Sequence, residues 1–135
     1  MLTGKLIHPQ LISALALCGH GDKILISDGN YPLDSKSGNA QKIYLGLTPG
    51  QPTVTDVLAA IQSVIEIEKA EVMQPTEGPD PEIFEEFTQM LGGMKLDRMG
   101  RFEFYDACCL PAVRLAICTG EKRTFSNILI TVGVA

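Results

Sequence analysis

The chain has 135 residues, enough for one domain with one hydrophobic core. Hydrophobic residues make up 45% of it and charged residues 20%, an ordinary composition for a globular protein. The net charge is -5 and no cluster of Lys or Arg is present, which argues against nucleic acid or an anionic membrane as a partner. No apolar run could span a bilayer and no signal-peptide pattern opens the chain, so we expect a cytoplasmic protein.

Turn and cap residues divide the chain into alternating helices and strands. Pro9 suits a first helical position and Gly19 a helix end. Thr53 is a good N-cap, and apolar side chains recur at helical spacing after it. The expected elements, in chain order, are helix 9–17, strand 24–27, loop 29–38, strand 42–47, turn 49–52, helix 53–63, strand 67–73, loop 76–81, helix 81–91, strand 95–98, helix 102–109, strand 113–119, loop 120–127 and strand 128–132.

This alternation of helices and strands predicts an α/β fold. We expect one domain over residues 1–135 with three layers, α/β/α, around a mixed and largely parallel central sheet. The four cysteines have mainly apolar neighbours and form no Cys-x-x-Cys pair, so we expect free thiols. Only two histidines are present and no metal-ligand spacing occurs, which argues against a metal site.

The segment around His20 and Asp28 is the most informative for function. His20 stands between two glycines, just past the end of the first predicted helix. It either complements the dipole of that helix or serves as an acid/base, because an imidazole titrates near neutral pH. Asp28 follows the first predicted strand, where α/β sheets bind ligands. Its carboxylate either accepts hydrogen bonds from a hydroxylated ligand or forms an Asx-turn with the residues that follow.

Other polar residues near predicted element ends are further candidates. Arg101 is either a solvated residue at a helix start or a ligand contact. Tyr105, among phenylalanines, is either a core residue or a second source of a hydroxyl. Ser126 and Asn127 precede the last strand and either form a turn or contact a ligand. From the residues alone we expect a site for a small hydroxylated molecule.

Several segments together resemble the D-ribose pyranase / L-fucose mutarotase family over nearly the whole chain. Gly19-His20-Gly21-Asp22 and the strand ending in Asp28 are similar to the family's N-terminal signature. Residues 47–52, 56–58 and 67–70 resemble the ribose branch more closely. Residues 101–105 resemble the fucose branch, which has arginine where the ribose branch tends to have histidine. Residues 119–121, 127–129 and 133–134 resemble the shared C-terminal segment.

The resemblance implies a sugar isomerase that changes the anomer or ring form of a free monosaccharide, with L-fucose-like sugars favoured over D-ribose by Arg101. It implies no cofactor and no metal. It implies a homo-oligomer, a ring that is often a decamer, with sites near subunit boundaries. The residues it assigns are His20 as proton donor, substrate contacts at Asp28, Arg101, Phe125, Ser126 and Asn127, and a secondary acidic position at Glu68.

One residue departs from the family pattern. Phe125 stands where the family has tyrosine, so a hydroxyl is missing from the expected site. If that hydroxyl takes part in proton transfer, the chain is a sugar-binding module without turnover, or it uses water or Tyr105 instead. If it only orients the sugar, its loss costs the worth of one hydrogen bond, about 0.5–1.5 kcal/mol.

Overall fold

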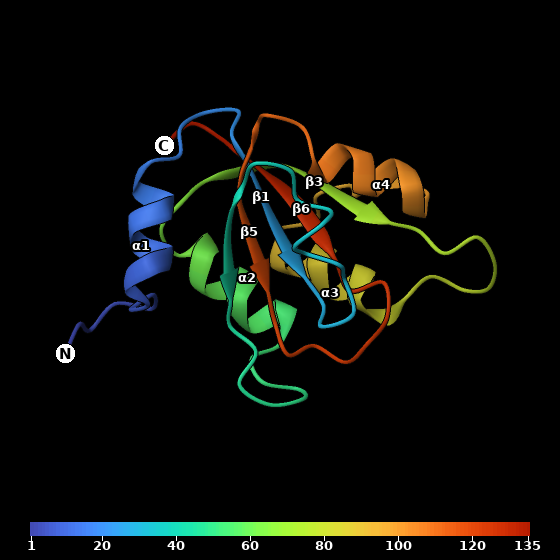
Figure 1. Ribbon diagram of the computed structural model, residues 1–135, viewed down its shortest axis with the longest axis horizontal. Coiled ribbons are helices and arrows are strands. Elements are labelled where there is room, and N and C mark those ends of the chain that lie inside the picture. Colours follow the sequence, from blue (N-terminus) through green and yellow to red (C-terminus); the bar gives the residue numbers. More distant parts are fainter.

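Six strands form one mixed sheet at the centre of the structure, a computed structural model that describes residues 1–135 (Figure 1). The strand order is β2-β5-β1-β6-β3-β4. Strands β2, β5 and β1 are parallel to one another, as are β3 and β4, and β6 runs antiparallel between β1 and β3. The strands are β1 (Lys23–Ser27), β2 (Gln41–Tyr44), β3 (Ile67–Met73), β4 (Asp97–Met99), β5 (Val113–Cys118) and β6 (Ile128–Val132).

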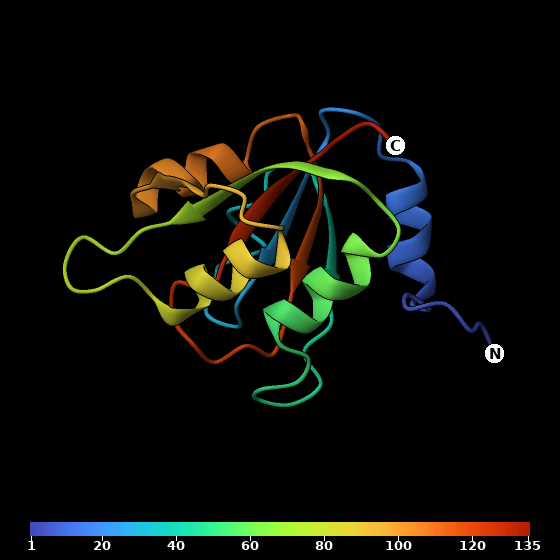
Figure 2. The same cartoon turned by 180° about the vertical axis from the view of Figure 1, so that it is seen from behind.

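Helices cover both faces of this sheet, so the predicted three-layer α/β/α fold is confirmed. Helices α2 (Val54–Gln62) and α3 (Glu82–Met90) cover the face seen in Figure 2, and α1 (Pro9–Ala16) lies at its β2 side. Their apolar side chains share a core with Ile24, Ile26 and Ile117 of the sheet. Helix α4 (Arg101–Cys108) lies on the other face, where Phe104 packs with Leu25 in a second core. No helix combines the length and apolar character that crossing a membrane requires.

The local signals placed most elements within one or two residues of their observed bounds. Thr53 caps α2 as predicted, and its hydroxyl and the Asp56 carboxylate each accept a backbone N–H of the other residue. The strand predicted over residues 42–47 is shorter and ends at Tyr44. The reason is that residues 48–51 form a tight turn that packs on Gly120, where a Cβ atom would lie 2.5 Å from the Gln51 carbonyl oxygen.

The antiparallel direction of β6 decides which segments meet at each edge of the sheet. The carboxyl ends of β1 and β3 lie beside the start of β6, because Ile26 and Val72 both pair with Ile128. The beginnings of β1 and β3 lie at the opposite edge, beside the end of β6. We call these the carboxyl edge and the amino edge, after the ends of β1. Asp28 and Asn127 therefore lie together at the carboxyl edge, whereas His20 and Glu68 lie at the amino edge.

Candidate functional site

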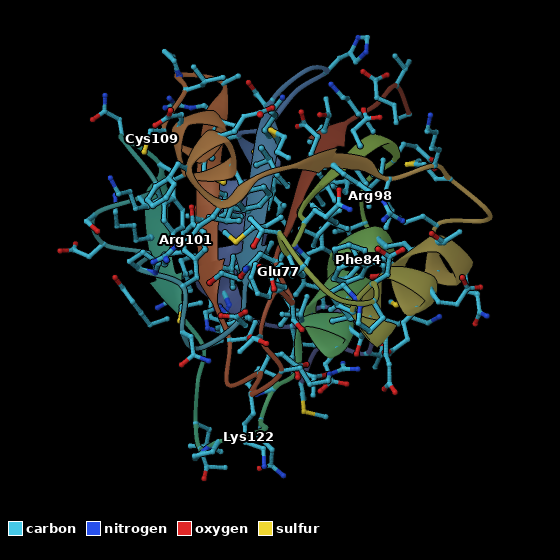
Figure 3. The ribbon with its side chains drawn as sticks, turned by 90° about the vertical axis from the view of Figure 1, so that its right-hand side faces the viewer. Glu77, Phe84, Arg98, Arg101, Cys109 and Lys122 are labelled. Atoms are coloured by element: carbon cyan, nitrogen blue, oxygen red, sulfur yellow. The ribbon has the colours of Figure 1, made fainter.

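A cavity of about 230 Å³ opens at the carboxyl edge, beside α4. It is smaller than the roughly 300–1,000 Å³ of sites for drug-sized ligands, so it suits a small molecule. Arg101 is the first residue of α4 and Cys109 follows its last, and both are labelled in Figure 3. The residues that line the cavity are Asp28, Asn30, Tyr31, Met73, Arg101, Tyr105, Thr124, Phe125 and Asn127.

Asp28 forms the turn that its sequence context suggested, and its side chain also lines the cavity. Its side chain is buried, and Oδ1 accepts the backbone N–H groups of Asn30 (2.9 Å) and Tyr31 (3.0 Å). Oδ2 accepts only the backbone N–H of Ser126, at 3.2 Å. Burial raises the pKa of Asp28 above its ordinary value, although these three hydrogen bonds oppose the rise. Because a carboxylate oxygen accepts about two hydrogen bonds, Oδ2 retains room for one ligand hydroxyl.

Asn127 is fixed against Asp28 by its side-chain oxygen. Asn127 Oδ1 accepts the backbone N–H of Asp28 at 2.9 Å, and the residue is 3% exposed. This contact orients the amide, so Nδ2 is the group left to act as a donor. Nδ2 makes no hydrogen bond within the chain. Asn127 thus offers two N–H donors beside the free acceptor of Asp28.

Arg101 and Tyr105 lie one turn apart at the start of α4 and form a pair. Arg101 Nε donates to the Tyr105 hydroxyl oxygen at 3.1 Å, and the guanidinium lies over the Phe102 and Tyr105 rings, at 5.3 and 5.5 Å from their centroids. Tyr105 is further fixed by an edge-to-face contact with Tyr31. Only Nε of the guanidinium is used, so both Nη groups remain as donors.

Phe125 and Ser126 contribute in different ways to the loop that closes the cavity. Phe125 has a φ of 57°, uncommon for a residue other than glycine, and its half-buried ring lines the cavity. Ser126 is buried and supplies its backbone N–H to Asp28. The Ser126 hydroxyl does not line this cavity, so this residue acts through its backbone.

Ion pairs of the exposed Arg123 with the buried Glu121 and with Glu86 anchor the same loop to the rest of the protein. Glu121 Oε1 accepts Arg123 Nε at 2.9 Å, and Arg123 Nη1 reaches Glu86 of α3 at 2.6 Å. Burial would raise the pKa of Glu121, but the hydrogen bonds from Arg123 and from the Val54 backbone outweigh it, and the pKa lies below its ordinary value. The charge of Glu121 therefore stabilises the loop in which Phe125, Ser126 and Asn127 lie.

His20 is not brought into this cavity. Both oxygens of Glu68 lie 3.0 Å from His20 Nε2, and the side chains of His20 and Glu68 are 57% and 44% exposed. The pair lies at the amino edge, and β1 stands between His20 and Asp28. Five strand residues span about 16 Å, so no single sugar ring could touch both side chains of one chain.

Four lining residues, Asn30, Tyr31, Met73 and Thr124, were not among the predicted site residues. Tyr31 lies in the predicted loop that follows Asp28, and its position next to that aspartate was the available signal. Met73 ends a strand that no local signal places beside Asn127. It reaches the cavity only because β3 pairs with β6.

The comparisons with known proteins identify the family. A model described as the RbsD / FucU transport protein family matches residues 1–135. The chain belongs to this family. A D-ribose pyranase of Symbiobacterium thermophilum is 32% identical over 129 residues, which cover 96% of this chain and 95% of that protein. A D-ribose pyranase of Clostridium botulinum is 28% identical over 129 residues, with the same coverage of each chain.

Solved structures of the family have the same fold. Bacillus subtilis RbsD complexed with D-ribose matches with a TM-score of 0.86 and 24% identity, over 100% of this chain and 99% of that one. The fucose mutarotase of Streptococcus pneumoniae in complex with L-fucose matches with a TM-score of 0.80 and 25% identity, over 96% and 94%. The pyranases and the fucose mutarotase named here are sugar isomerases, and the two solved structures each hold a free monosaccharide.

Proposed function

We propose that this chain is a sugar isomerase that interconverts the ring forms and anomers of a free monosaccharide, with D-ribose as the preferred substrate. The observation that carries this proposal is the set of unused hydrogen-bonding groups at one small cavity. Asp28 Oδ2 is a free acceptor, and Asn127 Nδ2 and the Arg101 Nη groups are free donors. A cluster of neighbouring hydroxyls, each both a donor and an acceptor, matches this arrangement.

The chemistry of ring opening requires two proton transfers. A proton is added to the ring oxygen while the anomeric hydroxyl loses one, and the C–O bond of the ring breaks to give the open-chain aldehyde. Closure on the other face, or by a different hydroxyl, reverses both steps. In this proposal Asp28, Asn127 and Arg101 hold the sugar hydroxyls. His20 transfers the proton to the ring oxygen, and a water molecule accepts the proton that the anomeric hydroxyl loses.

The proton donor must then come from a second copy of the chain. His20 of the same copy lies at the amino edge, whereas the cavity lies at the carboxyl edge. Glu68 holds Nε2, and Nδ1 makes no hydrogen bond within the chain, so this exposed imidazole is free to enter a neighbour's cavity. A contact between two different edges is heterologous, and repetition of such a contact forms a ring when the rotation between copies closes. This supports a homo-oligomer with its sites between subunits.

The choice of sugar rests on two observations that point to different members of the family. The curated relatives named above are D-ribose pyranases, and the structure with D-ribose has the higher TM-score. These similarities lead us to place D-ribose first, although the sequence pattern around Arg101 favoured L-fucose. L-fucose is the second candidate, because Arg101 lines the cavity with both Nη groups unused.

A third candidate is a sugar-binding module without turnover. It is motivated by Phe125, which brings a ring without a hydroxyl to the cavity wall.

Saturation-transfer NMR on purified protein tests the proposal. D-ribose and L-fucose are each mixed with the protein, and exchange between ring forms is compared with exchange in buffer. We expect faster exchange for D-ribose than for L-fucose. Exchange at the buffer rate for every sugar would overturn the enzymatic proposal, and binding without exchange would favour the binding module.

A further inference from the structure

The Tyr105 hydroxyl is the one phenol at the cavity whose proton has no acceptor within the chain. Tyr31, the other tyrosine that lines the cavity, donates its hydroxyl proton to the Lys36 carbonyl oxygen at 2.7 Å. Tyr105 is 8% exposed, and its only hydrogen bond is the one it accepts from Arg101. Because Tyr105 lines the cavity, a ligand oxygen placed there could accept this proton.

The contact with Arg101 also fixes the direction in which this hydroxyl can act. Arg101 has donors only, so the Tyr105 oxygen is the acceptor in their hydrogen bond. The hydroxyl proton must then point away from the guanidinium. The ring itself cannot turn freely, because Tyr31 and Phe102 contact it edge to face at centroid distances of 5.4 and 6.1 Å. Tyr105 is therefore a donor held in one place on the cavity wall.

We propose that Tyr105 contacts the substrate: its hydroxyl donates a hydrogen bond to one oxygen of the bound sugar and thereby selects the hydroxyl pattern that the site accepts. The inference rests on the proposed function. It supplies the cavity with a hydroxyl from α4. A sugar that lacks the matching oxygen would leave the Tyr105 proton unpaired, which is an effective way to reject an analogue.

The first experiment is a comparison of Tyr105→Phe with wild type across D-ribose, 2-deoxy-D-ribose and 3-deoxy-D-ribose. We expect Tyr105→Phe to reduce kcat/KM for D-ribose by about threefold to tenfold, the worth of one hydrogen bond. For the sugar that lacks the contacted oxygen, the variant and the wild type should react equally. An equal loss for all three sugars would overturn the contact and indicate a structural role. Tyr44→Phe is the matched control, because Tyr44 is an exposed residue of β2 outside the cavity.

A second experiment separates Tyr105 from its effect on Arg101. Tyr105→Phe is made in an Arg101→Gln background, where the guanidinium is already absent. We expect a further loss of about threefold or more in kcat/KM, because the sugar contact belongs to Tyr105 itself. No further loss would show that Tyr105 only positions Arg101, and would overturn the proposal.

Failure of the proposed function can be told apart from failure of this inference. If wild type exchanges no sugar, the same three sugars are titrated against both proteins by calorimetry. A loss of D-ribose affinity in Tyr105→Phe that disappears for one deoxy sugar would still support the contact. Equal affinities of the two proteins for every sugar would overturn it.

Discussion

The carboxyl and amino edges of the sheet differ in how their polar side chains are held. At the carboxyl edge, Asp28 and Asn127 are buried and bound to backbone N–H groups, so their geometry is set by the fold. At the amino edge, His20 and Glu68 are about half exposed and hold only each other. The carboxyl edge thus carries buried polar groups in fixed positions, and the amino edge presents exposed ones.

This difference teaches what each edge can do. A buried, prearranged set of donors and acceptors binds a ligand without further ordering of side chains. An exposed imidazole beside a carboxylate is free to approach a second molecule. We propose that the two edges of one chain are complementary halves of sites that form between copies. The predictions below test this division.

Removal of the His20 imidazole should have the largest effect on activity. His20→Ala should slow ring-form exchange by about 10²- to 10⁴-fold, because general acid catalysis contributes that much. D-ribose binding should change far less, since the binding groups lie at the other edge. Calorimetry and saturation-transfer NMR measure the two quantities separately. An equal loss of binding and exchange would remove the distinction between the two edges.

His8→Ala is the matched control for loss of an imidazole. His8 caps α1 by accepting the Leu11 backbone N–H at Nδ1, so its removal should lower stability by about 0.5–2 kcal/mol. Exchange by this variant should stay at the wild-type rate at temperatures where it is folded.

Loss of the Asp28 charge should mainly weaken sugar binding. Asp28→Asn replaces the carboxylate, whose Oδ2 has room for one more hydrogen bond, with an amide. A hydrogen bond to a charged group is worth about 1.5–3 kcal/mol, which corresponds to roughly a tenfold to 150-fold change in affinity. We expect KM for D-ribose to rise by that order. Asp34→Asn, an exposed change in the same loop, is the control. An unchanged KM in a folded Asp28→Asn protein would show that Asp28 only forms the turn and does not bind the sugar.

Addition of a hydroxyl at position 125 should have a smaller effect on kcat/KM, and the direction of that effect distinguishes the candidate functions. Phe125→Tyr places a phenol on the cavity wall, and one more hydrogen bond to the sugar should raise kcat/KM by about threefold to tenfold. A wild type that binds but does not exchange, beside a variant that does both, would instead establish the binding module. A decrease in affinity would show that the sugar packs against the bare ring.

The smallest effect concerns the loop that completes the carboxyl edge. The folded-state pKa of Glu121 lies below its ordinary value of 4.5, so its charge stabilises the fold above pH about 4.5, and this stability is lost as the pH falls through the lower folded-state pKa. Urea unfolding at pH 7 and pH 4 should show a smaller pH dependence for Glu121→Gln than for wild type. Identical pH dependence would exclude this role for Glu121.

Local sequence patterns predicted the helices and strands, but they could not predict contacts between segments that lie far apart in the sequence. Thr53 and Asp56 lie three residues apart, so their capping box could be predicted from the sequence. The pairing of Asp28 with Asn127 spans 99 residues and depends on the direction of β6, which no local pattern specifies. Likewise, the sequence marked His20 and Glu68 separately but could not show that they contact each other.

The placement of His20 and Asp28 shows the same limit. The sequence places them at the two ends of one short strand, and the structure keeps them there. The separation of His20 and Asp28 along β1 could therefore be predicted from the sequence. What the sequence could not provide is the contact between copies that would bring the two edges together, because that contact depends on surfaces formed only after folding.

The most direct test of a site divided between two copies is to mix two impaired variants, at a D-ribose concentration below KM. His20→Ala keeps an intact carboxyl edge, and Asp28→Ala keeps an intact amino edge. After unfolding and refolding together in equal amounts, random assembly should give about one quarter of the sites both wild-type halves, in a ring of heterologous contacts. The account predicts that exchange returns to about a quarter of the wild-type rate. Exchange no faster than the sum of the two variants refolded separately would contradict it.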